Sequence, residues 1–501
     1  MRWLFLTHRW LGILLCIPVA LWFASGIVML YIGYPKLTPW ERLSHLPVLD
    51  IGDVAAIPRQ VGQPDELRLV MVSDTSVFLA RHRNKWAAYD FRNGEPLKAD
   101  ASLALASARA FMSEGNPVYL GEVLEDTWTH SRALDSHRPL HRIAMNDAAG
   151  TELYVSSQTG EVVRDASHME RAWNYIGTWL HWLYMFRGGK LDAIYLQVVI
   201  GLSSIGTLML VLGVWIGISR FRLRSEYTSR KGRTPYREPW KRRHHLLGLA
   251  FAATSILWMF SGIMVANPGK VFSARHQPAN SELFAGGRLM LASFETTPAE
   301  AIATAHAELG QIKELRWHWF DGEPWYIAYN GYGDTRIVSG KAPLRVFAQF
   351  DFDRLFIAAE RSLVGAQVIE RSVLTTYDNW YLQRVAHSME GHIERRLPVL
   401  RIEFGDTEQT WLHVDPYTGT IHNQLDERRR WRRWLFSAIH SWDFVGLIDR
   451  RPLWDLVMIV FCGGGLVLSV TSLTLSIRRL KRYFCRVSVR SCLIANIDKN
   501  S

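Results

Sequence analysis

Two histidines, His8 and His244, occupy the same place at the start of two long apolar segments of the 501-residue chain. Each stands four residues before a glycine, and the glycine of a Ser-Gly pair follows that glycine fourteen residues later. A tryptophan recurs at the same offset, as Trp22 and Trp258. A histidine placed identically at the edges of two apolar segments is a candidate ligand that each half of the chain supplies once.

A second pair of histidines, His181 and His440, repeats in the same way. Gly160 lies 21 residues before His181, and Gly419 lies 21 residues before His440. Each of these glycines closes a strand–turn–strand pattern on Thr-Gly. After each histidine come a glycine-containing stretch, an aspartate and another apolar segment. The sequence therefore predicts two copies of one unit: apolar span, polar domain, histidine-bearing segment and apolar span.

Histidines in such pairs are suited to binding haem iron. Two imidazoles that approach from opposite sides provide the axial ligands of a b-type haem. His8 and His244 fall at one edge of the spans, and His181 and His440 fall at the other. We therefore predict two b-type haems per chain, one held by each pair, which together form an electron path across the bilayer.

Other readings of the histidines are less well supported. Interfacial histidines that cap helices or contact lipid headgroups are the alternative, but a repeat that pairs four of them by face favours ligation. His245 is the rival of His244, although its counterpart in the first half is Arg9. A zinc site would require further ligands nearby. The sequence contains no C-x-x-C-H, which excludes covalent c-type haem attachment.

Four apolar runs are long enough to cross a bilayer and must position these histidines. They are Leu11–Ile32, Ala193–Ile218, Leu246–Ala266 and Leu453–Ile477. The net charge is +11, and ten lysines and arginines lie between Arg220 and His245 alone. By the positive-inside rule this segment and both termini face the cytoplasm, and the two long polar segments lie outside. Because the basic charge follows the membrane edges, we predict no nucleic-acid partner.

Both long polar segments show the patterns of small α+β domains. In the second, residues 297–309 have helical apolar spacing, a threonine cap and an early proline. Strand-like runs follow at residues 314–320 and 324–330. In the first polar segment, residues 102–111 are the corresponding helix.

A helix followed by an antiparallel sheet that closes on Thr-Gly is similar to the PepSY domain. Together with the two H-x-x-x-G span openings, this makes the chain resemble the PepSY-associated transmembrane family over nearly its whole length. That family includes iron-regulated membrane proteins and ferric-siderophore reductases. The resemblance implies a haem-containing reductase of the bacterial inner membrane that passes electrons to a ferric siderophore or similar ferric chelate outside.

We therefore predict a membrane protein with an α-helical bundle of four transmembrane helices, two extracytoplasmic α+β (PepSY-like) domains and an internal duplication. The predicted transmembrane helices are 1–33, 191–220, 244–267 and 453–478. The PepSY-like domains with their histidine-bearing segments are 34–190 and 268–452, the basic cytoplasmic loop is 221–243, and the cytoplasmic tail is 479–501.

The electron donor is expected to be a quinol or a separate reductase. The sequence contains no G-x-G-x-x-G fingerprint, and the cytoplasmic loop is too short for a flavin domain. Two alternatives are a non-enzymatic PepSY membrane protein with a regulatory or binding role, and a quinone-linked electron carrier. A transporter is disfavoured because the four spans carry almost no charge.

Three further groups have competing explanations. The arginines between Arg428 and Arg433 are suited either to haem propionates or another anionic ligand, or to lipid headgroups. Gly201 and Gly463–Gly465 permit either close helix approach or room for a macrocycle. A third group has no counterpart in the second half and is expected to be solvated: His130, His137 and His141.

Overall fold

The computed structural model describes residues 2–49, 57–187, 189–223, 227, 233–275 and 278–497. Part of the predicted basic loop, residues 224–226 and 228–232, lies outside the described residues. The chain divides into two compact units. The helical unit comprises Met1–Ile32, Tyr175–Phe272 and Trp431–Ser501, and the sheet unit comprises Gly33–Asn174 and Ser273–Arg430.

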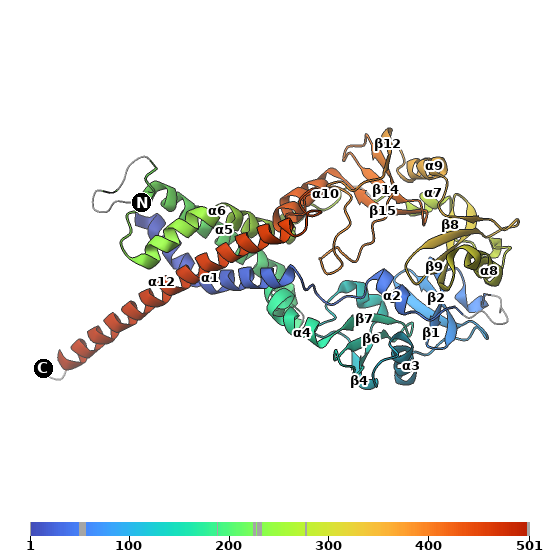
Figure 1. Ribbon diagram of the computed structural model, residues 1–501, viewed down its shortest axis with the longest axis horizontal. Helices are drawn as coiled ribbons and strands as arrows, with labels where there is room; N and C mark the ends of the chain where they lie inside the picture. Colours follow the sequence, from blue (N-terminus) through green and yellow to red (C-terminus); the bar gives the residue numbers. More distant parts are fainter. Residues whose placement is uncertain are drawn as a thin grey trace. The chain divides into compact units, whose positions relative to one another are not determined.

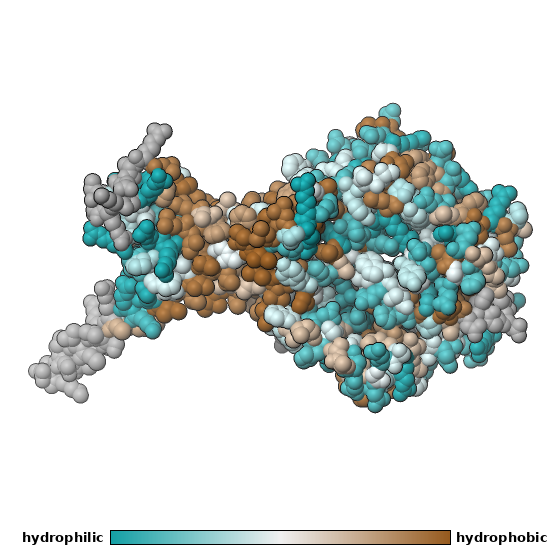
Figure 2. Space-filling view, in the orientation of Figure 1, coloured by the Kyte–Doolittle hydropathy of each residue, from teal (hydrophilic) through white to brown (hydrophobic). Residues whose placement is uncertain are grey.

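Within its described residues, the helical unit contains four helices that are long and apolar enough to cross a membrane. They are α1 (Arg2–Met29), α5 (Tyr195–Arg220), α6 (Pro239–Val265) and α12 (Leu453–Ile497). The four helices run side by side (Figure 1). Both α1 and α6 pack against α5 and against α12, so α1 and α6 occupy opposite corners of the bundle. Figure 2 shows hydrophobic surface over these helices, as contact with lipid requires.

The helices coincide with the four apolar runs of the sequence and extend some of them. α1 begins before the apolar run, and α12 continues as a helix through the basic residues that follow Ile477. α6 begins with Pro239 at its first position, and the Glu238 side chain accepts a hydrogen bond from the backbone of Lys241. Between the helices lies an apolar core formed by Leu15, Val19, Phe23, Met209 and Met259.

The described part of the sheet unit forms three antiparallel sheets. Two of them have four strands, each drawn from one half of the chain. The first is β4 (Val118–Val123), β5 (Leu140–Ala144), β6 (Glu152–Ser156) and β7 (Val162–Ala166); the second is β12 (Val368–Leu374), β13 (Val399–Phe404), β14 (Trp411–Asp415) and β15 (Thr420–Leu425). The predicted strand–turn–strand patterns are β6–β7 and β14–β15, and the turn glycines Gly160 and Gly419 both have positive φ.

The third sheet has seven strands in the order β11-β10-β9-β8-β1-β2-β3. Its strands from the first half are β1 (Glu66–Val72), β2 (Thr75–His82) and β3 (Lys85–Asp90). Those from the second half are β8 (Ile312–Phe320), β9 (Glu323–Asn330), β10 (Thr335–Ser339) and β11 (Val346–Phe347). The two polar segments therefore share a sheet through the β1–β8 pair, a connection that the sequence did not indicate.

The remaining helices of the sheet unit are short. The predicted helices are α3 (Ala101–Phe111) and α8 (Pro298–Leu309), and α8 has the capping box of Thr297 and Glu300. α8 covers one face of the seven-stranded sheet, while α9 (Phe352–Ser362) packs into a core with the other face. The others are α2 (Pro39–His45), α4 (His168–Asn174), α7 (Ser281–Ala285), α10 (Glu427–Arg432) and, in the helical unit, α11 (Ile439–Ser441).

Buried ion pairs join the two polar segments at the shared sheet. The carboxylate of Glu314 on β8 has no exposed side-chain surface and pairs with Arg42, Arg68 and Arg316. Arg42 and Arg68 also pair with Glu161, at 3.1 and 3.2 Å. The arginine charges, together with the hydrogen bond from Arg42, outweigh burial and hold the pKa of Glu314 well below its usual range.

Replacing Glu314 with glutamine is expected to destabilise the full chain by about 3–5 kcal/mol, because the arginines would keep their buried charge without the carboxylate. Glu323→Gln is the matched control on the adjacent strand, since its half-exposed ion pair with Arg354 is worth about 0–1 kcal/mol. Thermal unfolding of the detergent-purified variants measures the difference. Equal unfolding midpoints for the two variants would contradict this role of Glu314.

Candidate functional site: two pairs of histidines

The four repeated histidines lie in two pairs within the helical unit. The imidazole centroids of His8 and His244 are 6.3 Å apart, and their planes make an angle of 41°. The centroids of His181 and His440 are 5.9 Å apart, with an interplanar angle of 74°. All four residues are half-buried. Each pair combines one histidine from each half of the chain, as the repeat predicted.

In every paired histidine the Nδ1 atom is hydrogen-bonded within the protein. His8 Nδ1 lies 3.0 Å from the carbonyl oxygen of Met209, and His244 Nδ1 lies 3.0 Å from Thr471 Oγ1. The contact with the carbonyl requires a proton on His8 Nδ1, which leaves Nε2 as the nitrogen with a lone pair. Among the described residues, no hydrogen bond engages Nε2 of either histidine.

The second pair is held by two matched serines. His181 Nδ1 lies 3.0 Å from Ser25 Oγ on α1, and His440 Nδ1 lies 2.9 Å from Ser261 Oγ on α6. These serines belong to the recurring Ser-Gly pairs of the sequence. Burial lowers the pKa of His181 to about 4, and burial with the neighbouring His181 imidazole lowers that of His440 to about 3. Both rings are therefore neutral at pH 7, the form that binds a metal.

The two recurring tryptophans hold the backbone of the same histidines. Trp22 Nε1 donates to the carbonyl oxygen of His181 at 3.1 Å, and Trp258 Nε1 donates to that of His440 at 2.9 Å. The repeat in the sequence includes these tryptophans, but it did not indicate that they take part in the site. Their hydrogen bonds show that α1 positions His181 and α6 positions His440.

An unusual backbone conformation surrounds both of these histidines. A π-helical turn at Tyr175–Trp179 ends two residues before His181, and another at Arg433–Ala438 ends two residues before His440. Two residues after each histidine, Leu183 and Trp442 have positive φ. Non-glycine residues with positive φ are uncommon, and π-helical turns are frequent at functional sites. No sequence signal that we used predicts these turns.

The two pairs lie at different levels of the bundle. His8 precedes Ser25 by 17 residues on α1, and His244 precedes Ser261 by 17 residues on α6. At a rise of 1.5 Å per residue, each interval spans about 25 Å of helix. A hydrocarbon core is about 30 Å thick. The two pairs therefore lie about 25 Å apart along these helices.

The structure distinguishes His244 from His245, the alternative candidate for the ligand. The side chain of His245 is buried, with Nδ1 2.8 Å from Thr234 Oγ1 and Nε2 2.9 Å from the carbonyl oxygen of Gly217. Both of its ring nitrogens are thus engaged by the protein. His244, which faces His8, is the residue whose Nε2 remains available.

The histidine pairs fit axial ligation of a haem. A metal–imidazole bond is about 2 Å long and the ring nitrogen lies about 1 Å from the ring centre, so two opposed axial imidazoles have centroids roughly 6 Å apart. Both observed separations agree with that value. An Nδ1 hydrogen bond to the protein is also the usual support of a ligating histidine. No group of three or more side chains that could hold a metal ion occurs among the described residues.

Two of the four glycines that the sequence singled out serve close helix approach. A Cβ on Gly464 would collide with the ring of Phe251, and one on Gly465 with the ring of Phe23, so these two glycines permit close packing. Gly201 and Gly463 face open space, with no other atom within 4 Å of an added Cβ.

The arginines at 428–433 have partners within the protein. Arg428 pairs with Glu408, Arg429 with Asp426, and Arg433 with Asp443 at 2.8 Å. The guanidinium of Arg430 donates to the carbonyl oxygens of Gln409 and Leu425. These contacts give the cluster a structural role that neither prediction from the sequence included.

The three histidines of the first polar segment are not solvated, contrary to expectation. His141 is buried, with Nδ1 3.0 Å from the Tyr119 hydroxyl and Nε2 2.8 Å from the carbonyl oxygen of Ala99. His130 Nδ1 lies 2.6 Å from a Glu125 carboxylate oxygen, and His137 Nδ1 lies 3.2 Å from Ser156 Oγ. The prediction failed for His141 and His137 because the strands and the segment before β5 bring Tyr119 and Ser156 beside them. The partner of His130 lies only five residues away, at Glu125.

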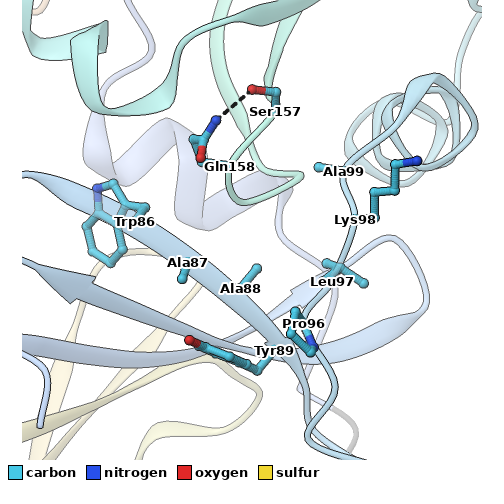
Figure 3. A pocket seen from close by; sticks show the side chains of 10 residues that line it. All are labelled: Trp86, Ala87, Ala88, Tyr89, Pro96, Leu97, Lys98, Ala99, Ser157 and Gln158. Carbon is cyan, nitrogen blue, oxygen red and sulfur yellow. Dashed lines mark hydrogen bonds between the residues drawn. The ribbon is translucent and has the colours of Figure 1, made fainter. Parts of the chain in front are cut away.

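A cavity of about 450 Å³ lies in the sheet unit (Figure 3). Ala87 and Ala88 of the edge strand β3 form part of its lining, with Trp86 at one end and Lys98 at the other. The Gln158 amide donates to Ser157 Oγ across its rim at 3.0 Å. Lys98 is the one charged side chain in the lining, so the cavity offers few groups to orient a ligand.

Comparison with protein families gives one assignment. The family model described as PepSY-associated TM region matches residues 5–479. No curated protein matches the chain.

Adding a methyl group at Gly213 tests the pair of His8 and His244, because a Cβ there would lie 2.7 Å from His8 Cε1. Gly213→Ala should displace the His8 ring and remove one haem of the predicted two, at a cost of about 1–3 kcal/mol in stability. Gly201→Ala on the same helix is the control and should retain both. Haem content of the purified variants is the readout, and equal content in the two would contradict the geometry of this pair.

Proposed function

Because the chain belongs to the PepSY-associated transmembrane family, we propose that it is an inner-membrane reductase that passes electrons to a ferric siderophore or similar ferric chelate outside the cytoplasm. The observation that carries the proposal is the pairing of four histidines at two levels of the bundle. We also propose that the chain is an internal duplication, in which each half supplies one ligand of each pair.

His8 with His244, and His181 with His440, are proposed to hold one b-type haem each. Haem iron, when bound, would supply a centre that accepts and releases one electron at a time. The chain's own contribution is to fix the ligands. The Nδ1 hydrogen bonds orient each imidazole and leave Nε2 for the iron.

The direction of electron flow rests on topology. The basic segments at the ends of α5, α6 and α12 are proposed to face the cytoplasm, as the positive-inside rule implies, together with the N-terminus. The pair of His8 and His244 is then cytoplasmic, and that of His181 and His440 is extracytoplasmic. A quinol or a separate reductase would donate electrons, since the sequence has no nucleotide-binding fingerprint.

The outer partner would be an iron chelate. Transfer of one electron converts its ferric ion to the ferrous ion, which siderophore-type chelators bind weakly, so that the iron is released. The sheet unit contains none of the four cysteines of the chain. It is therefore suited to binding the chelate rather than to thiol redox chemistry.

Single histidine substitutions test the cofactor assignment. His8→Ala and His244→Ala should each cost one haem per chain, and His181→Ala and His440→Ala should each cost the other. Pyridine extraction of the purified variants gives the haem count, and their absorption spectra distinguish the two haems. His245→Ala is the control and should keep both, because its two ring nitrogens are bonded within the protein. Wild-type protein that is expressed in haem-replete cells and purified folded but colourless would refute the assignment.

Electron transfer to the substrate is tested on the reduced protein. After anaerobic reduction with dithionite and removal of the excess, a ferric hydroxamate chelate should reoxidise the protein rapidly, with release of trapped ferrous iron. His440→Ala should slow this reaction at least tenfold, because it removes the outer ligand. If every ferric chelate leaves the protein reduced while a quinone oxidises it at once, the protein is a quinone-linked electron carrier instead.

A further inference from the structure

Two arginines at one end of the helical unit lie against aromatic rings of a neighbouring helix. The guanidinium carbon of Arg220, the last residue of α5, is 5.2 Å from the ring centroid of Phe5 on α1. That of Arg478, on α12, is 5.6 Å from the ring centroid of Trp240 on α6. A guanidinium within about 6 Å of a ring centroid makes a cation–π contact. Both arginines are therefore oriented by the bundle, although both are exposed.

The aromatic rings place these arginines next to the pair of His8 and His244. Phe5 precedes His8 by three residues on α1, and Trp240 precedes His244 by four residues on α6. Residues three or four apart share one face of a helix, with Cβ atoms about 5–6 Å from each other. Each guanidinium therefore lies about one helical turn beyond a histidine, on the side away from the other histidine pair.

The helices that carry the arginines contact the same two histidines. A Cβ on Gly213 of α5 would lie 2.7 Å from His8 Cε1, and Thr471 Oγ1 of α12 lies 3.0 Å from His244 Nδ1. On each helix the arginine follows that contact by seven residues. Seven residues make about two turns, so the arginine projects from nearly the same helix face as the contact. Each half of the chain thus brings one arginine to the same end of the histidine pair.

Both guanidinium groups have donors left for a further anion. Among the described residues, no carboxylate forms an ion pair with Arg220. Arg478 pairs with Glu238 at 2.9 Å through a single nitrogen, and the two side chains are 46% and 33% exposed. An exposed pair of this kind is worth about 0–1 kcal/mol. Because a guanidinium has five N–H donors, neither arginine is saturated by its contacts within the protein.

We propose that Arg220 and Arg478 bind the two propionates of the haem held by His8 and His244. The inference rests on the proposed function, since it requires a haem at this pair. A propionate ends in a carboxylate, which arginine binds through two parallel N–H···O bonds. One arginine from each half would receive one propionate, and the two together would orient the charged edge of the macrocycle toward this end of the bundle.

Anionic lipid headgroups are the competing ligand, because basic residues at a membrane edge commonly bind them. Contact with lipid would account for the charge of the two arginines. It would not account for their repeated position, one turn beyond a ligand histidine and two turns beyond the helix contact with that histidine. The repeated position favours the propionates.

The test compares haem with an ester that lacks the propionate charge. Full-length apoprotein from haem-deficient cells is purified in detergent and titrated with ferric protohaem or with its dimethyl ester. The titrations use the His440→Ala background, which removes the other predicted haem site. Arg220→Gln, Arg478→Gln and the double variant are compared with Arg479→Gln. Arg479 is the matched control, because it is an adjacent, exposed arginine that points about 100° away around α12.

The control should bind protohaem at least tenfold more tightly than the ester. Each single arginine variant should lower this preference at least threefold, and the double variant should bind the two ligands equally, with its affinity for the ester unchanged. The ratio within each variant cancels the different solubility of the two ligands. A purely structural role, or a role in lipid binding, would weaken both ligands alike.

Haem transfer to excess apomyoglobin repeats the comparison with all four histidines in place. One of the two haems should leave the double variant at least tenfold faster than it leaves the control. The same preference for protohaem in the double variant and the control, or equal weakening of both ligands, would overturn the inference and leave the haem assignment intact. If no variant binds either ligand, the haem assignment itself fails, and this inference fails with it.

Discussion

The hydrogen bond to Nδ1 of each paired histidine is the interaction on which the rest of the site depends. An imidazole bonded at Nδ1 can rotate little, and its other nitrogen is fixed in direction. The partners differ between the levels: a carbonyl oxygen of α5 and a threonine of α12 at one, and the matched serines Ser25 and Ser261 at the other. All four lie on membrane-spanning helices, so the packing of those helices sets the geometry of both pairs.

The arrangement of the helices explains why the histidines pair across the halves. α1 and α6 occupy opposite corners of the bundle. Each carries a histidine near one end, a tryptophan 14 residues later and a serine 17 residues later. Side chains that project from opposite corners meet at the centre, where bundles commonly hold cofactors. The segments that contain the π-helical turns lie outside the long helices and place the ring centroids of His181 and His440 5.9 Å apart.

The pairing of the histidines was predictable because a repeat can be recognised from the order of the residues alone. The matched intervals after His8 and His244, and before His181 and His440, fix equivalent places in the two halves. The shared seven-stranded sheet was not predictable in this way, since β1 and β8 are some 240 residues apart and no local pattern specifies a partner so distant. The same limit applies to His141, whose partners come from a strand and a loop far along the chain.

The measurement that tests the central claim most directly is electron paramagnetic resonance of the oxidised, purified protein at low temperature. Two axial imidazoles give low-spin ferric haem, and the spread of its g values grows as the ring planes approach the perpendicular. With interplanar angles of 41° and 74°, the account predicts two low-spin signals, the outer pair giving the larger maximal g value. A dominant high-spin signal, which marks iron with an open axial position, or the absence of any haem signal would contradict it.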